Sequence, residues 1–229
     1  MRLDTRRFLG TVSALVAAIA LSGAIPAYAG PASSAQDRVN DSLKIVRQMQ
    51  RNPSLAAVLN RARGVFIIPH YGKGGFIVGG QGGGGVVLVQ HGGVWSSPAF
   101  YSMSGGSIGA QAGGEGGAVA MILMTQKAVN RFERSSGGWS LNGNAGLTVV
   151  KWSGKTQANT GRGDVVLWTN TSGLYGGLTA SITHMSPDTK MDRAYYHRPV
   201  TSGEILAGNV RTVGADPLRN ALASRMASR

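Results

Sequence analysis

Residues 64–117 read GVFIIPHYGKGGFIVGGQGGGGVVLVQHGGVWSSPAFYSMSGGSIGAQAGGEGG, and nineteen of these fifty-four residues are glycine. Short apolar runs alternate with the glycines, such as VFII at 65–68, FIV at 76–78 and VVLV at 86–89. A flexible Gly/Ser linker lacks such runs because it has no core to bury. Apolar β-branched runs bounded by Gly-Gly are typical of strands joined by tight turns. The stretch therefore predicts ordered and strongly curled β-structure.

Strand patterns continue beyond this stretch. We expect strands at 64–69, 74–81, 85–91, 95–103, 107–113, 118–124, 139–152, 164–170 and 174–185. Most connections between them are too short for a crossover helix, which takes about a dozen residues, so the strands should be antiparallel. The expected fold class is α+β, with a Gly-rich, strongly curved antiparallel β-sheet or barrel flanked by short helices in a single domain.

Helices are expected at both ends of the chain and once between strands. The expected helices start at Ser33 or Ser34 and stop at Pro53, start again at Ser54, cover 126–134 after a cap at Thr125, and cover 216–226. The first two have an apolar stripe and a basic remainder. Such helices can lie on a membrane, although most of them pack on their own domain.

The first 29 residues read as a signal peptide. Arg2, Arg6 and Arg7 precede an apolar run at 11–25, and Ala27-Tyr28-Ala29 follows as a small-residue cleavage signal. A membrane anchor fits less well, because a span needs about twenty apolar residues. We therefore expect an exported, periplasmic or secreted domain at 30–229, with a peripheral position at the outer membrane as one alternative. Both the general and the twin-arginine export routes fit.

The chain is strongly basic, with 23 Lys and Arg against 10 Asp and Glu. Between residues 42 and 163 there are twelve basic residues, and the only acidic ones are Glu115 and Glu133. Such a balance attracts polyanions: anionic phospholipid, lipopolysaccharide-type headgroups or nucleic acid. Export favours lipid. The alternative is a solvated surface whose charge only maintains solubility.

A series of motifs resembles the SYLF lipid-binding domain family. The motifs are ARGVFIIP at 62–69, GGFIVGG at 74–80, GGVV at 84–87, Tyr101, GSIGAQAG at 106–113 and MTQKA at 124–128. The resemblance covers about residues 55–185. It implies a binding module for phosphoinositides or anionic lipids, which in eukaryotic members is often attached to SH3 or FYVE domains and sometimes linked to actin binding. For this chain we expect a signal peptide and no such partner domain.

Two patterns imitate enzyme motifs. Residues 105–109 spell G-x-S-x-G around Ser107, but a nucleophile elbow needs a strand-to-helix turn, and Ala-Gln-Ala-Gly-Gly follows instead. Residues 80–85 spell G-x-G-x-x-G, but a strand pattern follows where a helix should open. We expect no enzyme activity.

Neither a metal nor a nucleic acid is indicated. The four histidines are scattered without metal-ligand spacing, so no metal and no cofactor are expected. The four tryptophans lie in strand patterns, where core packing accounts for them as well as base stacking does.

Three hypotheses remain. The first is a non-catalytic module that binds anionic lipids or phosphoinositide-like headgroups at a bacterial envelope membrane surface. Its candidate residues are Arg47, Arg51, Arg61, Arg63 and Lys73, with a second cluster of Lys127, Arg131 and Arg134. The second is a structural or envelope protein-interaction module with an unknown protein partner. A serine hydrolase is a distant third.

Overall fold

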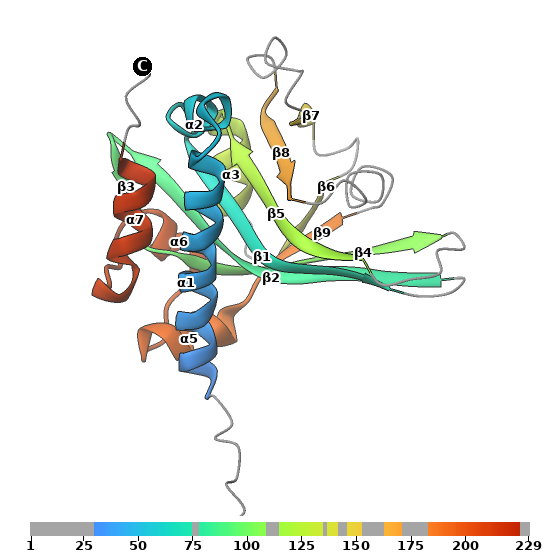
Figure 1. The fold of residues 1–229 in the computed structure, drawn as a ribbon. Coiled ribbons are helices and arrows are strands. Elements are labelled where there is room, and N and C mark those ends of the chain that lie inside the picture. Colours follow the sequence, from blue (N-terminus) through green and yellow to red (C-terminus); the bar gives the residue numbers. More distant parts are fainter. Residues whose placement is uncertain are drawn as a thin grey trace, which may run out of the picture.

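A computed structural model describes residues 30–74, 78–108, 115–134, 137–141, 146–152, 163–170 and 183–224. The predicted signal peptide, residues 1–29, lies outside this part of the chain. The helices and strands within it form one α+β domain, as predicted (Figure 1).

Nine strands of the described residues form one strongly curled, open sheet. They are β1 (Gly64–Gly74), β2 (Val78–His91), β3 (Val94–Trp95), β4 (Ala99–Ile108), β5 (Glu115–Leu123), β6 (Trp139–Leu141), β7 (Val149–Lys151), β8 (Val165–Thr169) and β9 (Thr183–Pro187). The strand order is β6-β9-β4-β2-β1-β5-β8-β7, and the short β3 pairs with β2. The sheet is thus a half-barrel that ends at β6 and β7.

The pairings are antiparallel with one exception, the parallel pair β7–β8. The predicted antiparallel arrangement holds for every other described pair, and this edge pair is the exception. Thirteen residues separate Lys151 from Val165, which is long enough for the crossover that a parallel pair requires.

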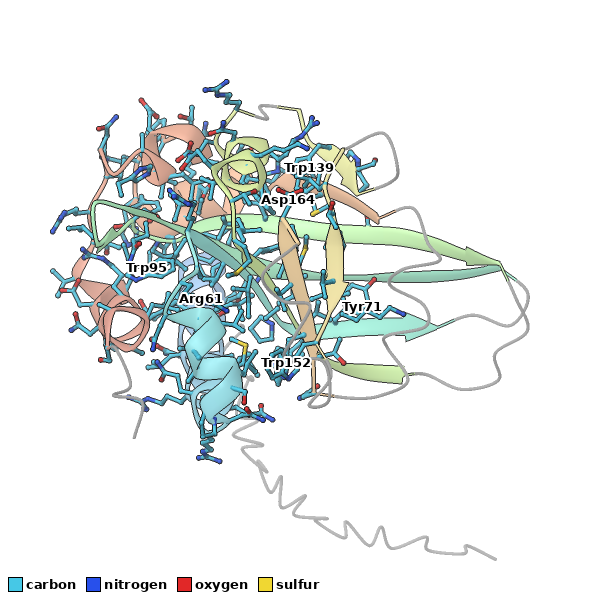
Figure 2. The ribbon with its side chains drawn as sticks, turned by 90° about the horizontal axis from the view of Figure 1, so that it is seen from above. Arg61, Tyr71, Trp95, Trp139, Trp152 and Asp164 are labelled. Atoms are coloured by element: carbon cyan, nitrogen blue, oxygen red, sulfur yellow. The ribbon has the colours of Figure 1, made fainter. Side chains whose placement is uncertain are left out.

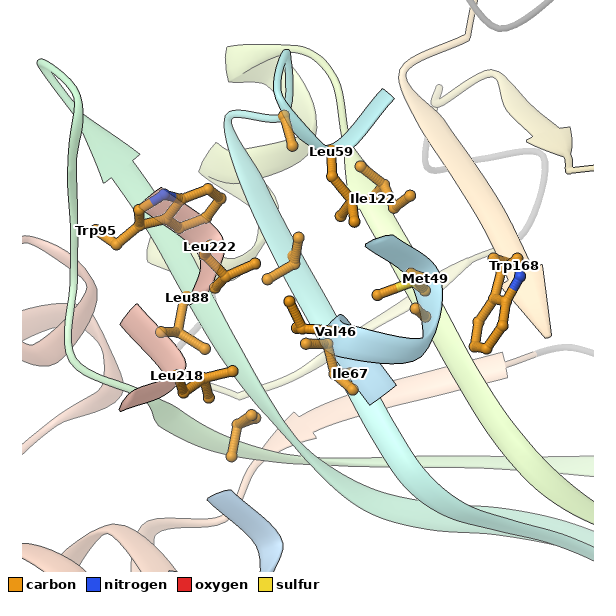
Figure 3. Close-up of a cluster of buried hydrophobic side chains, with 14 of the residues drawn as sticks. Val46, Met49, Leu59, Ile67, Leu88, Trp95, Ile122, Trp168, Leu218 and Leu222 are labelled. Carbon is orange, nitrogen blue, oxygen red and sulfur yellow. The ribbon is translucent and has the colours of Figure 1, made fainter. Parts of the chain in front are cut away.

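Helices cover both faces of the sheet. One face carries α1 (Pro31–Gln50), α2 (Pro53–Leu59), α5 (Thr189–Tyr196) and α7 (Asp216–Ala223), and the other carries α3 (Gln126–Glu133) and α6 (Ser202–Leu206). A 3₁₀ turn, η3 (Val213–Ala215), precedes α7. Each face has its own hydrophobic cluster, and successive residues of β1 enter them alternately, Val65 and Ile67 in one, Phe66 and Ile68 in the other. Figure 3 shows the first cluster, with Val46 and Met49 of α1 packed near Ile67.

The two ends of the described chain meet in this first cluster. The Gln50 side-chain amide, in the last turn of α1, donates a hydrogen bond of 2.7 Å to the carbonyl of Ala221 in α7. Leu218 and Leu222 of α7 lie in the same cluster as Val46 and Leu88. The core over this face is therefore completed only by the last helix.

The helix caps correct several details of the sequence prediction. Gly30 is the N-cap of α1, so Ser33 and Ser34 lie inside the helix. The cap of α2 is Asn52, whose side-chain oxygen accepts from the amides of Ser54 and Leu55, while Pro53 occupies the first helical turn rather than stopping a helix. Thr125 caps α3, as predicted. The sequence prediction missed α5, capped by Asp188, and α6, whose Thr201 and Glu204 form a capping box.

The glycine tract of β2 is a strand and not a turn between two strands. Residues 78–81 of the expected strand 74–81 and the whole expected strand 85–91 belong to the single strand β2, because Gly82 to Gly85 pair with Ser104 to Tyr101 of β4, whereas Gly74 ends β1 and 75–77 lie outside the described residues. Facing them, β1 is irregular between Ile67 and Gly72. A Cβ atom on Gly83 would lie 2.4 Å from the carbonyl oxygen of His70, and one on Gly85 would lie 2.1 Å from that of Ile67. Glycine is required here because the two backbones approach too closely for a side chain.

One buried carboxylate ties α5, α6 and β4 together. Asp192 is 0% exposed. Its two oxygens accept hydrogen bonds of 2.9 Å from the amide of Phe100 and the hydroxyl of Ser202. Burial raises the pKa of Asp192 from 3.8 to about 6, although these two hydrogen bonds oppose the shift.

This pKa shift predicts a pH-dependent stability. A carboxyl group whose folded pKa is raised stabilises the fold fully below pH 3.8, and this contribution is lost as the pH rises through about 6. Asp192→Asn keeps an acceptor for the amide of Phe100 and removes the titration. In urea unfolding, the free energy of unfolding of the variant relative to the wild type should therefore rise by about 2–3 kcal/mol between pH 4 and pH 7. A difference that stays constant over this range would show that burial does not raise this pKa.

Candidate functional site

One end of the sheet brings the predicted arginines together. At this end β1 starts at Gly64, which pairs with Val89 near the end of β2 and with Leu123 at the end of β5. The amide of Arg63 donates to the carbonyl of Leu123, and the amide of Gln90 donates to the carbonyl of Arg63, both at 2.8 Å. Arg63 is therefore fixed between two strand ends.

Three more arginines lie at the same end. Arg47 and Arg51 are one turn apart at the C-terminus of α1, and Arg61 follows α2. Figure 1 shows the end of α1, α2 and the start of β1 together at the top of the molecule, and Figure 2, which looks down on this end, shows Arg61 on the near side. We call Arg47, Arg51, Arg61 and Arg63 the basic end.

The side chains of the basic end are exposed and available. All four arginines are exposed. Within the described ranges, no ion pair joins any of them to a carboxylate. Unpaired, solvated guanidinium groups can form charge-assisted bidentate hydrogen bonds with phosphate.

Acidic residues lie at the middle of α1 and beside its N-terminal half. Asp41 pairs with Lys44 at 2.7 Å and with His70 at 3.0 Å, and hydrogen bonding from these two side chains lowers the pKa of Asp41. Asp188 lies 3.8 Å from the guanidinium of Arg38. Asp41 lies six residues before Arg47, or about 9 Å along the helix, and both acidic residues are paired with basic side chains other than those of the basic end.

The second predicted cluster lies on the other face of the sheet. Lys127, Arg131 and Arg134 are on α3, which packs against the second hydrophobic cluster through Ala128, Val129 and Phe132. Because α3 starts two residues after β5, its first turn adjoins the basic end. Lys127 donates to the carbonyl of Gly146. The two clusters therefore meet at the end of the sheet but cover different faces of it.

Asp164 is an acidic residue near this end, and its carboxylate forms hydrogen bonds within the domain. Its oxygens accept from the amide of Thr148 at 2.9 Å and from the hydroxyl of Thr125 at 2.7 Å. These hydrogen bonds, that of Thr148 first, lower the pKa of Asp164. The carboxylate holds the start of α3 against β8, so it stays charged and engaged within the fold.

Lys73 does not join the basic end. It lies nine residues further along β1 than Gly64, and nine strand residues cover about 30 Å. The sequence grouped Lys73 with the N-terminal helices because the two are close in number, whereas an extended strand carries it away from them.

The motifs that imitate enzyme sites lie in strands. Ser107 pairs with Gly79 in the β2–β4 ladder, so its backbone is that of a strand and not of a strand-to-helix elbow. Residues 80–85 lie within β2. Among the described residues, no three His, Asp or Glu side chains come together as metal ligands.

The helices of the described residues are also too short or too polar to cross a membrane.

Comparison with known proteins identifies the family. The family model described as "Ysc84: Las17-binding protein actin regulator" matches residues 104–225, more than half of the chain. The chain belongs to the Ysc84, or SYLF, family. The resemblance seen in the sequence at 55–185 is confirmed, and the family match extends it through α5, α6 and α7.

Two fungal proteins are similar to this SYLF chain. Protein YSC84 of Saccharomyces cerevisiae is 31% identical over 175 residues, which cover 73% of this chain and 37% of the yeast protein. SH3 domain-containing protein PJ696.02 of Schizosaccharomyces pombe is 28% identical over 177 residues, which cover 74% of this chain and 41% of that protein. The SYLF chain thus spans about two fifths of each relative. No solved structure matches it significantly.

Membership of the SYLF family supports a binding role, since the family is described by binding and regulation.

The β2–β3 hairpin also lies at the basic end, and the sequence analysis did not single it out. Its signal was the Gly92-Gly93 pair between two strand patterns, which marks a two-residue hairpin turn. Only the pairing of β1 with β2 shows that this turn lies beside Arg63.

Proposed function

We propose that this protein is a non-catalytic module that binds anionic lipid headgroups at a bacterial envelope membrane through its basic end. The observation that carries the proposal is the grouping of Arg47, Arg51, Arg61 and Arg63, all exposed and without a described carboxylate partner. The acidic residues Asp41 and Asp188 pair with Lys44, His70 and Arg38 instead. A surface of this kind orients the domain toward a negatively charged membrane.

The energetics suit reversible peripheral binding. Each Lys or Arg near an anionic surface contributes about 1 kcal/mol, and the attraction decays over a Debye length of about 8 Å at physiological salt. Four arginines therefore give a useful but salt-sensitive attachment. Phospholipid, phosphoinositide-like and lipopolysaccharide-type headgroups all present the phosphate oxygens that guanidinium groups bind.

The proposed location follows from the leader-like sequence of residues 1–29. Export would place the domain in the periplasm or outside the cell, where it would meet the inner membrane's outer leaflet or the outer membrane. The basic end would then face the bilayer, and the N-terminal start of α1 would face away from it.

A second candidate is protein binding, which the family description "Las17-binding protein actin regulator" favours. In this chain the partner would be an envelope protein with an acidic surface. The same four arginines would bind that acidic surface. The two candidate functions therefore use the same site and differ only in whether the partner is a lipid or a protein.

Liposome flotation tests the proposal. Residues 30–229, which contain every described helix and strand, should float with vesicles containing 30% phosphatidylglycerol and remain at the bottom with pure phosphatidylcholine. Raising NaCl from 0.1 M to 0.5 M should release most of the protein, because the Debye length shortens. Failure to bind anionic vesicles at low salt would contradict lipid binding and favour the protein partner. Binding that resists the higher salt would contradict the electrostatic mechanism.

A further inference from the structure

The β2–β3 hairpin is the second feature of the end that carries the arginines. Gln90 pairs with Trp95 and His91 pairs with Val94, and Gly92 and Gly93 form the turn with φ of 57° and 88°. Glycine adopts these positive φ values without strain. Figure 1 shows the hairpin at the same end of the molecule as α2. Its base is bound to the basic end, since Gln90 donates to the carbonyl of Arg63.

The base of this hairpin is held firmly. Trp95 is 3% exposed and lies in the first hydrophobic cluster with Leu222 of α7. Its carbonyl accepts from the Arg219 guanidinium at 3.1 Å. The imidazole Nε2 of His91 lies 3.0 Å from the carbonyl oxygen of Leu206 in α6. Contacts to helices on both faces of the sheet therefore fix the direction in which the turn points.

The tip, in contrast, is open and apolar. Val94 is 50% exposed, although the next residue is buried. A Cβ atom on Gly92 or Gly93 would meet no other atom within 4 Å, so space surrounds the turn. A single exposed valine is ordinary on a protein surface. This one differs because it stands at the tip of a rigid, glycine-rich turn beside a cluster of unpaired arginines.

A second exposed valine provides an internal comparison. Among the described residues, the large hydrophobic side chains that are exposed are Val94 and Val213. Val213 is 81% exposed and precedes α7. Its neighbour Gly214 accepts from Gln36 at 3.1 Å, which places Val213 beside the first turns of α1. Arg51 is fifteen helical residues further along, or about 22 Å. An exposed valine does not by itself mark the basic end, because Val213 lies far from it. Val94 is the exposed valine that stands on a protruding turn near the basic end.

We propose that the Gly92-Gly93-Val94 turn is a membrane-inserting tip, which enters the headgroup and acyl-chain boundary of an anionic bilayer while the basic end holds the phosphates. This inference rests on the proposed function. At membrane surfaces, basic residues commonly attract the anionic headgroups while a neighbouring apolar side chain inserts shallowly into the bilayer. The two glycines lack side chains that would prevent the turn from approaching the lipid.

Single-cysteine labelling tests the tip, since the chain contains no cysteine. Val94→Cys and Val213→Cys, each in residues 30–229 and labelled with the environment-sensitive fluorophore NBD, are mixed with vesicles containing 30% phosphatidylglycerol. The label at 94 should show a blue shift and a several-fold rise in emission, and nitroxide-labelled lipid should quench it. The label at 213 should change little, because it lies far from the basic end.

The outcomes separate the tip from the proposed function. If both labelled proteins float with the vesicles but the label at 94 stays in water, the inserting tip is wrong and lipid binding by the basic end stands. If neither floats, the proposed function itself fails, and the tip fails with it. As a second measurement, Val94→Asn should weaken binding to the same vesicles by about three- to tenfold through lost apolar burial, and Val213→Asn should not. Equal effects of the two substitutions would overturn the assignment.

Discussion

Replacing Arg47, Arg51 and Arg61 together by Gln is expected to weaken binding to anionic vesicles by about a hundredfold. Each charge near an anionic surface contributes about 1 kcal/mol, and 1.4 kcal/mol changes affinity tenfold. The fold should persist, because all three side chains are exposed and lack described ion-pair partners. Flotation or surface plasmon resonance on vesicles, at fixed salt, measures the change.

The chain offers a matched control for net charge. Lys190, Arg193 and Arg198 are exposed and lie in or just after α5, whose N-cap Asp188 is near Arg38 in the second turn of α1. Changing these three to Gln removes the same charge from the opposite end and should reduce binding only slightly. Equal losses in both triple variants would mean that overall charge, and not the basic end, governs binding. The corresponding variant of Lys127, Arg131 and Arg134 shows whether the α3 face also approaches the bilayer.

Gly85→Ala should destabilise the domain by about 3 kcal/mol or more. The added methyl group would lie 2.1 Å from the carbonyl oxygen of Ile67 and 2.9 Å from the side chain of Ile68. Overpacking a tight site typically costs about 1–3 kcal/mol, and here the obstacle is backbone in the centre of the sheet, which cannot rotate away. Urea unfolding followed by tryptophan fluorescence gives the free energy of unfolding.

Gly72→Ala is the comparison for Gly85→Ala. A Cβ atom at Gly72 would meet nothing within 4 Å, and its φ lies outside the left-handed region. The substitution should leave stability unchanged or raise it by up to about 1 kcal/mol, because alanine restricts the unfolded chain. If both variants lost the same stability, the close approach of β1 and β2 would not be the reason for the glycine tract.

The apolar runs were sufficient to predict the central strands, since 65–68, 86–89 and 118–123 are each buried in the sheet. They could not show that Gly82 to Gly85 continue a strand, because glycine turns and glycine strands look alike until the partner backbone is known. The missed α5 and α6 are short, and their capping residues carry the signal rather than their periodicity.

The basic end could be predicted only in part. Arg47, Arg51, Arg61 and Arg63 are close in sequence, and their basic character was evident. Their position beside α3 and the β2–β3 hairpin depends on Gly64 pairing with both Val89 and Leu123. Such long-range register is not encoded in any local window. The same pairing places Lys73 at the far end of the strand.

The packing of α1 against α7 makes the first hydrophobic cluster depend on segments that are far apart in the sequence. Gln50 and Ala221 are 171 residues apart, and their hydrogen bond joins the first and last helices. Strand β9 likewise reaches back about eighty residues to β4. Until the final helix is available, Val46 and Leu88 lack the leucines that cover them. The core over this face therefore depends on contacts between residues 171 positions apart in the sequence, and such non-local contacts make folding slow.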